Sequence, residues 1–462
     1  MLTALIGLTN PAHRTDRSMG ESDRGIQSID TFRGFTIFAM IFVIMVAGYQ
    51  HLPLTFPHFG SAPVSTFKHA GNDGDAGEWA FWEGRTPART YRPAKVVAES
   101  AGPGAQGRRL YDVAIVNARG ESEIVVHGAE IRTARPLRPN EKIIAVLTPP
   151  AAGPASVVGA PYRFEQIGIG CTFTDLVAPF FVFIVGLCIP LSRQRRQAGW
   201  WKHVALRTTG LILAGMLYIS LILKLSYWWG VLQAIGVAYL MAAVFMLLPA
   251  WPRWIAVGAV AALHSWATWH LSWWVTLGDP AKPFWTIVTP DGDMLRPLTV
   301  HCTPWASIAY GICAVVGTLL GEAVVTREKT TIVRRALAIG LPLTAAGYLL
   351  HLYHLPMSKD DVSSSYAIFT SGLAALVFLG VFLVVDVFGR RRWAGVFDVF
   401  GRNALLAYFM QPVVRIVLQA LGLYQGFLGH AAWTGMLVGL GWTMLLWCAV
   451  LWCNRKGLYW KL

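Results

Sequence analysis

Ten stretches of about 20 mostly apolar residues constrain this chain more than any other feature. A helix of that length crosses the hydrocarbon layer of a membrane, so the stretches predict a polytopic membrane protein. The composition agrees, because 55% of the 462 residues are hydrophobic and only 14% are charged, against roughly 25% charged residues in soluble domains. It excludes a disordered or fibrous chain and disfavours a soluble multidomain enzyme. The predicted spans are 32–54, 173–192, 203–223, 228–248, 254–275, 304–325, 332–353, 366–388, 396–421 and 433–453.

The net charge of +14 is at first sight compatible with nucleic-acid binding. Its distribution indicates something else. The short loops and span ends on one predicted side of the membrane hold 21 Lys or Arg residues, and the short loops on the other side hold 4. Because Lys and Arg collect on the cytosolic side, we predict that both termini are inside and that the long segment after the first span is outside. Membrane lipids are therefore expected partners, and nucleic acid is not.

The long segment, residues 72–168, has the pattern of a small β domain. Tyr111, Val113 and Ile115 alternate with Asp112 and Ala114, as in a half-buried strand. Further short apolar runs and a Trp-Glu-Gly motif at 82–84 loosely resemble an SH3- or Tudor-like barrel, which we interpret as a spacer or lid rather than a peptide-binding module.

The predicted fold is thus an all-α polytopic membrane bundle of about 10 transmembrane helices, with an inserted small β-barrel-like extracytoplasmic domain. The predicted division is a cytoplasmic segment 1–31, the first helix with an outer His-containing segment 32–71, the β insert 72–168, helices two to ten in 169–454, and a cytoplasmic tail 455–462.

Ionisable residues in or near the membrane are candidates for function. At the predicted inner end of the first span, Asp30 and Arg33 are three positions apart, so they share a helix face and can pair. One interpretation is a helix-start ion pair. The other is a structural lock near the phosphate of a cytosolic cofactor.

At the predicted outer end, His51, His58 and His69 could each take a proton from an attacking amine or hydroxyl. Their spacing matches no metal-ligand pattern, nor does that of the six cysteines, so no metal is predicted. Most of the cysteines are interpreted as small apolar core residues. Asp175 could orient a histidine or polarise a hydroxyl, or it could be a helix N-terminal charge with Thr172 or Thr174 as the cap.

Several of these motifs, in their order along the chain, resemble the heparan-α-glucosaminide N-acetyltransferase family of membrane acetyltransferases. The resemblance implies transfer of an acetyl group from cytosolic acetyl-CoA to an amino sugar across the membrane. It also implies that His69, in the Lys-His-Ala motif, is the catalytic histidine. The matching segments are 28–34, 67–70, 170–175, 179–186, 230–233 and 401–408.

The sequence departs from the family pattern in four places. About a hundred residues separate His69 from the Gly170 motif, which the family joins almost directly. Ile44, Ala234 and Gln411 stand where the family usually has Asn, Arg and His.

The leading hypothesis is an acetyl-CoA-dependent N- or O-acetyltransferase of the bacterial inner membrane, acting on an extracytoplasmic glycan. Direct transfer and an acetyl-histidine intermediate both stay open, as does a homodimer. A glycan or lipid-linked-substrate transporter and an inactive scaffold are the rival hypotheses. The predicted catalytic residues are His69 and Asp175; those for the donor are Arg33, Arg193, Arg195, Arg196, Gln233 and Asn403; and those for the acceptor are Asp30, Lys68, Thr172 and Trp285.

Overall fold

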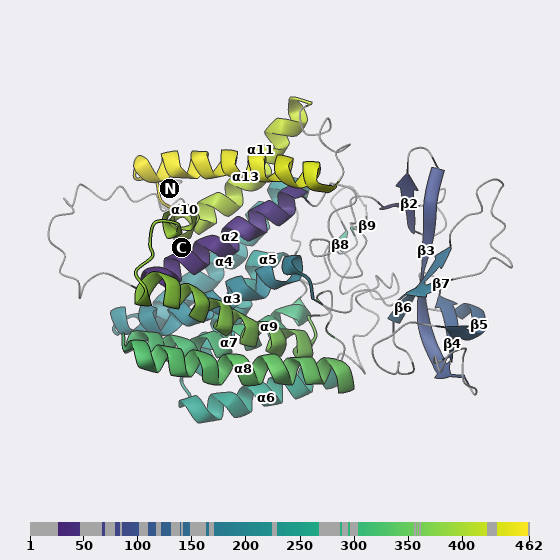
Figure 1. The fold of residues 1–462 in the computed structure, drawn as a ribbon, viewed down its shortest axis with the longest axis horizontal. Helices are drawn as coiled ribbons and strands as arrows, with labels where there is room; N and C mark the ends of the chain where they lie inside the picture. The colour runs from purple at the N-terminus through teal and green to yellow at the C-terminus, as the bar shows by residue number, and fades with distance from the viewer. Residues whose placement is uncertain are drawn as a thin grey trace.

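The structure is a computed structural model in which two kinds of architecture are present: a body of helices and a group of β-strands (Figure 1). Of the residues discussed above, His51, His58, Gly170 and Trp285 lie outside the described part, as do the side chains of Lys68 and His69. The described residues are 26–46, 67–69, 79–83, 86–100, 110–116, 122–130, 139, 142–147, 163–165, 171–223, 229–267, 287–288, 294–295, 304–354, 357, 359, 362–422 and 432–460.

Each of the ten predicted spans coincides with helical structure, although the ninth is divided into α10 and α11 at Asn403. The helices are α2 (Gln27–Val46), α3 (Phe173–Arg195), α4 (Trp200–Leu223), α5 (Val231–Phe245), α6 (Ala250–Ala267), α7 (Pro304–Val325), α8 (Lys329–Tyr353), α9 (Ser364–Phe382) with its π-helical continuation η7 (Leu383–Val387), α10 (Ala394–Arg402), α11 (Ala404–Ala420) and α13 (Ala432–Arg455).

Among the described residues, six helical stretches are long and apolar enough to cross a membrane, which identifies an integral membrane protein. Two shorter apolar helices, Val231–Phe245 and Ala404–Leu418, accompany them. The count of about 10 crossings stays a prediction. The six stretches are Gln27–Val46, Phe173–Arg195, Ala306–Thr326, Lys329–Tyr353, Ser364–Val387 and Thr434–Arg455.

Helix α3 lies at the centre of the bundle, against α2, α5, α7 and α9. Small residues let α3 and α7 approach closely. A side chain added at Gly186 would collide with the backbone of Ala314, and one added at Gly317 would collide with the carbonyl oxygen of Phe183. Helices in membranes commonly associate through such small residues. Lipid tails are as apolar as the side chains, so the attraction between helices comes from close packing rather than from the hydrophobic effect. The close contacts hold α3 in a fixed position.

The strands form one antiparallel sheet of seven strands, with β2 and β4 along one edge of the long β3 and β6 along the other. The predicted burial of Tyr111, Val113 and Ile115 is confirmed, but Ala114 is fully buried as well, so this part of β4 is not the half-buried strand that the alternation predicted. Barrel closure stays a prediction, since no described pairing joins β5 to β1 or β7. The strands are β1 (Phe67–His69), β2 (Trp79–Glu83), β3 (Thr86–Glu99), β4 (Leu110–Val116), β5 (Ser122–Glu130), β6 (Lys142–Leu147), β7 (Arg163–Glu165) and a separate hairpin of β8 (Ile287–Val288) and β9 (Met294–Leu295).

Candidate functional site

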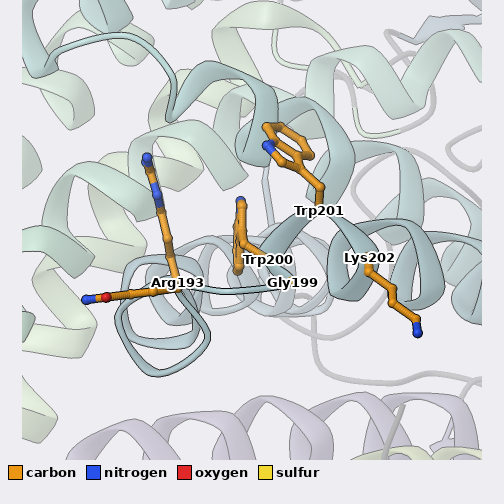
Figure 2. Close-up of a pocket in the computed structure, with 6 residues that line it drawn as sticks. Arg193, Gly199, Trp200, Trp201 and Lys202 are labelled. Atoms are coloured by element: carbon orange, nitrogen blue, oxygen red, sulfur yellow. The ribbon is translucent and has the colours of Figure 1, made fainter.

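The turn between α3 and α4 encloses a cavity of about 420 Å³. Gly199 allows this turn because its φ of 87° lies in the left-handed region, which other residues rarely adopt. Figure 2 shows Arg193 and Trp200 extending from the turn in the same direction, with Lys202 on the following helix. The cavity combines cations with two indole rings. Its lining residues are Arg193, Gln197, Gly199, Trp200, Trp201 and Lys202.

The three arginines predicted for the donor at this turn differ in position. Arg193 lines the cavity, and its Nη1 donates to the carbonyl oxygen of Met246 at the end of α5, at 2.9 Å. Arg196 donates to the hydroxyl of Ser192 at 3.1 Å, and Arg195 is exposed; neither belongs to the cavity lining. The geometry therefore favours Arg193 over the other two as a ligand-binding cation.

Arg33 lies further inside the bundle, on α2. Its Nη1 donates to Asp30 at 3.0 Å, which confirms the predicted ion pair, and also approaches the carbonyl oxygen of Gly401 at 3.5 Å. Its Nη2 donates to the thiol sulfur of Cys188 on α3 at 3.1 Å. The guanidinium thus connects a carboxylate, a backbone carbonyl and a thiol.

A second partly buried guanidinium, that of Arg207 on α4, extends this group. It lies over the ring of Tyr239 on α5, 5.2 Å from the ring centre, and interacts electrostatically with Cys188 and Arg33. Such a cation–π contact offsets part of the cost of burying the charge. We define Arg33, Cys188, Arg207 and Tyr239 as the cationic cluster.

Several buried polar atoms around the cationic cluster have no hydrogen-bond partner in the described structure. They are Nε of Arg207, the hydroxyl of Tyr239, Nε2 of His203 and the hydroxyl of Thr208. Buried polar groups are normally bonded, so this concentration indicates a place where a ligand or water completes the bonding. Sequence reasoning missed the cluster. The sequence does contain an indication of it, because Arg207 lies inside the predicted span 203–223. An ionisable residue within a span is costly and is therefore a candidate for function.

The other end of α3 carries a different group, centred on Asp175, which is 1% exposed. Its Oδ2 accepts from the backbone N–H of Thr172 at 2.9 Å and from the Thr172 hydroxyl at 3.0 Å. Its Oδ1 lies 3.7 Å from the ammonium nitrogen of Lys359. The predicted helix cap is therefore confirmed, and Lys359 is a partner that the sequence did not reveal.

Two neighbours complete this second group. The hydroxyl of Tyr366 on α9 donates to the backbone carbonyl of Asp175, which ties α9 to the start of α3. Burial raises the pKa of the Cys171 thiol far above its ordinary value, and the negative charge of Asp175 raises it further. Cys171 is therefore a neutral thiol, and the charge at this end resides on Asp175 and Lys359.

Gln233 and Asn403, two other residues predicted for the donor, are bonded within the protein. Gln233 is fully buried, and its Oε1 accepts from the N–H of Gly230 at 3.0 Å. The amide nitrogen of Asn403 donates to the carbonyl oxygen of Leu458 at 2.8 Å, and its oxygen accepts from the N–H of Trp460 at 3.1 Å. Their predicted donor role gains no support from this geometry.

The predicted catalytic His69 belongs to strand β1, where it pairs with Trp79 of β2, and Lys68 pairs with Ala80. Their backbones thus extend the sheet of the insert. Their side chains are not described, so the relation of His69 to Asp175 stays a prediction.

The geometry described above can be compared with known proteins. Residues 158–356 match the sequence profile of the family described as heparan-alpha-glucosaminide N-acetyltransferase, catalytic. The matched region contains Asp175, Arg193, Arg207 and Tyr239, while Arg33 and Lys359 lie outside it. A search of curated proteins finds no match. The match confirms the resemblance seen in the motifs over residues 158–356, and it suggests a membrane acetyltransferase.

Proposed function

We propose that this protein moves an acetyl group from cytosolic acetyl-CoA to an amino or hydroxyl group of an extracytoplasmic glycan. The observation that carries the proposal is the pair of polar sites at the two ends of α3. Asp175 lies in the first turn of this 23-residue helix and Arg193 in its last turns. At 1.5 Å per residue they are about 27 Å apart, close to the hydrocarbon thickness of a membrane.

The cavity at the α3–α4 turn suits the nucleotide end of acetyl-CoA. Its phosphates carry negative charge, which Arg193 and Lys202 would neutralise, and a guanidinium fits a phosphate well. The indole rings of Trp200 and Trp201 offer flat apolar surface to the adenine. The predicted topology places this turn in the cytosol, where acetyl-CoA is present.

The acyl end of the donor would reach the cationic cluster by entering the bundle beside α3. Charged and polar donors held in a water-poor site stabilise the oxyanion that forms when a nucleophile attacks a thioester carbonyl. The buried Nε of Arg207 and hydroxyl of Tyr239, both without a partner in the described structure, are suited to this role.

The acceptor would enter the bundle from the opposite end, past the ion pair of Asp175 and Lys359, and extend its reacting group toward the cationic cluster, about 20 Å along α3. The carboxylate is fully engaged by Thr172 and Lys359, so we assign it a positioning role. His69 is the proposed base that takes the proton of the attacking group. Lys68, Thr172 and Trp285 remain proposed contributors to acceptor binding. Asp30 pairs with Arg33 beside the cationic cluster, at the other end, so we assign it the positioning of Arg33 instead.

The proposed setting is the bacterial inner membrane, with both termini in the cytosol and the β insert on the periplasmic or extracellular side. Membrane lipids surround the helices, and a homodimer is compatible with this arrangement.

Binding of acetyl-CoA to the purified full-length protein, measured by titration calorimetry, tests the proposal. We expect saturable binding that Arg193→Ala weakens at least tenfold. Arg195→Ala is the matched control, because this cation lies on the same helix end but does not line the cavity. Proteoliposomes containing acetyl-CoA, with amino sugars supplied outside, should then yield acetylated sugar.

The alternatives give different results. A transporter or an inactive scaffold would yield no acetylated sugar in the proteoliposomes. A wild-type protein that binds no acetyl-CoA overturns the proposal outright.

A further inference from the structure

We propose that Cys188 is the nucleophile that first receives the acetyl group, forming an acetyl thioester on the protein before the acceptor is acetylated. This inference deepens the proposed acetyltransferase function and rests on it. It differs from the routes suggested by the sequence, direct transfer and an acetyl-histidine, in placing the first chemical step at a thiol inside the bundle.

The position of Cys188 suits a residue that receives the acetyl group from the donor and passes it to the acceptor. It lies on α3 between Asp175 and Arg193 and is partly buried. Cys188 and Arg193, which lines the proposed nucleotide cavity, are about 7.5 Å apart along the helix axis. A donor whose phosphates are held at the cavity therefore needs to extend only its flexible arm into the bundle to bring its thioester to this sulfur.

Positive charge lies close to the sulfur of Cys188, and it would compensate the negative charge of an attacking thiolate. Nη2 of Arg33 donates to its sulfur at 3.1 Å, and Arg207 interacts with it electrostatically. Asp30 balances one of these two guanidiniums. The described interactions of Arg207 include no carboxylate; its favourable partners are Tyr239 and Cys188, so a negative charge on the sulfur would offset part of its charge.

Arg33 is held in the orientation that this contact requires. Its other nitrogen is bonded to Asp30 at 3.0 Å and approaches the carbonyl of Gly401 at 3.5 Å. A side chain at Gly401 would collide with the carbonyl oxygen of Asp30, so the glycine permits the close crossing of α2 and α10. The guanidinium is thereby fixed from two helices before any ligand arrives.

The unpartnered polar atoms of Arg207 and Tyr239 are an independent sign of a ligand in the cationic cluster. Tyr239 is 2% exposed, and its hydroxyl has no partner in the described structure; nor has Nε of Arg207. Both are donors. They are suited to bind the oxygen of an acyl carbonyl. This oxygen gains negative charge when a thiolate attacks the carbonyl carbon.

The chemistry balances without any redox step. The Cys188 thiolate attacks the carbonyl carbon of acetyl-CoA, a carbon–sulfur bond forms to the protein, and the carbon–sulfur bond to CoA breaks. CoA leaves as the thiolate, so charge is conserved. The acceptor amine or hydroxyl then attacks the protein thioester and loses its proton to a base, and the Cys188 thiolate is released. One thioester replaces another in the first step, so the acetyl group stays activated.

The other described cysteines lack these features. Cys171 is neutral; the thiol of Cys313 lies 3.5 Å from the carbonyl oxygen of Ala367; Cys448 is exposed on α13; and Cys453 is buried on the same helix. None of them has an arginine hydrogen-bonded to its sulfur within the described ranges.

The test is to incubate the purified full-length protein with acetyl-CoA alone, quench with acid and locate acetyl groups by peptide mass spectrometry. We expect one acetyl group on the peptide with Cys188, removed by neutral hydroxylamine, which cleaves thioesters. It should be absent in Cys188→Ala and retained in Cys448→Ala, the matched control. Release of CoA should match the acetyl group in amount.

A second measurement does not depend on the Cys188→Ala variant folding. In the wild type, N-ethylmaleimide should modify Cys188 faster than Cys313, and acetyl-CoA should slow that reaction. Arg33→Gln should reduce the rate about tenfold, since thiolate is the reactive form. Lys329→Gln, which removes an exposed cation at the start of α8, should leave the rate unchanged.

The outcomes separate this inference from the proposed function. Acetyl-CoA binding and sugar acetylation that persist in Cys188→Ala would overturn the thiol intermediate and leave the acetyltransferase intact. A second pair of results would also overturn the thiol intermediate and leave the acetyltransferase intact. The wild-type protein would turn over acetyl-CoA but carry no acetyl group on Cys188 after an acid quench, and its Cys188 would react with N-ethylmaleimide no faster than Cys313. Absence of acetyl-CoA binding would instead overturn the acetyltransferase proposal itself.

Discussion

The ammonium nitrogen of Lys359 lies 3.7 Å from Oδ1 of Asp175, and this contact joins the connection between α8 and α9 to the first turn of α3. The same turn is bonded to Tyr366 of α9 through the backbone carbonyl of Asp175. Both charges are largely removed from water, since Asp175 is 1% exposed and the Lys359 side chain 11%. A buried pair is costly to break, because each charge then lacks its partner.

Lys359→Met should therefore destabilise the protein by about 3 kcal/mol, because it removes the ammonium group that faces the buried carboxylate of Asp175. Thermal unfolding of the purified protein in detergent checks this. Lys329→Met is the control, because Lys329 is exposed at the start of α8 and its loss should have little effect.

A double-mutant cycle makes the same prediction sharper. Asp175→Asn combined with Lys359→Met should be less destabilised than the sum of the single variants, since the double variant contains no unpaired charge. Strict additivity of the two changes would show that the pair contributes nothing.

The crossing of α2 and α10 gives a second prediction. Gly34→Ala should destabilise by about 1–3 kcal/mol, because the added carbon would collide with the carbonyl oxygen of Phe397 and the two backbones would have to separate. Gly395→Ala on α10 is the matched control, because nothing lies within 4 Å of its added carbon. Detergent-based unfolding compares the two variants. Equal stability of both would mean that the helices can separate without cost.

These contacts show where sequence reasoning succeeds and where it ends. The apolar runs locate the helices because length and hydropathy are local properties, and the spacing of Asp30 and Arg33 fixes their pairing on one helix face. The partner of Asp175 could not be found in this way. Lys359 is distant in the chain, and only the packing of α9 against α3 brings it close.

Cys188 illustrates a second limit. Its apolar neighbours in the chain predicted a small core residue, and its arginine partner comes from another helix. Strands β1 and β7 were missed for a different reason, since three residues are too few to show an alternating pattern. The division of the ninth span at Asn403 depends on bonds to Leu458 and Trp460, which no local pattern indicates.

The β insert should lose stability in acid through Asp112. The pKa of its carboxyl is held below the ordinary value, first by a hydrogen bond from the Ser100 hydroxyl, then by the N–H of Gly128 and by His127. A lowered pKa in the folded state means that the stabilisation is complete above the unfolded value, near about 3.9. It is lost as the pH falls through the lower, folded value.

Hydrogen–deuterium exchange of the full-length protein measures this effect, after correction for the intrinsic pH dependence of exchange. Peptides from β4 and β5 should exchange faster as the pH falls below about 4. Asp112→Asn should remove most of that change, because the amide does not titrate. Retention of the full pH response in this variant would assign it to other groups.

The hydrogen bond between Tyr218 and Gln411 gives the last prediction. The Tyr218 hydroxyl donates to Oε1 of Gln411 at 2.8 Å, and its ring stacks on Tyr408 with centres 4.3 Å apart. Gln411 stands where the family usually has His, and it is 2% exposed. Tyr218→Phe keeps the stacked ring but removes the donor, so a buried amide oxygen loses this bond.

Tyr218→Phe should therefore cost about 1–3 kcal/mol in unfolding free energy. Combining it with Gln411→Leu should recover part of that loss, because both polar groups are then gone. Tyr353→Phe, on an exposed tyrosine at the end of α8, should change stability by less than about 0.5 kcal/mol. If Tyr218→Phe were as stable as this control, the bond to Gln411 would have no net value, and the contact of α4 with α11 would depend on ring packing alone.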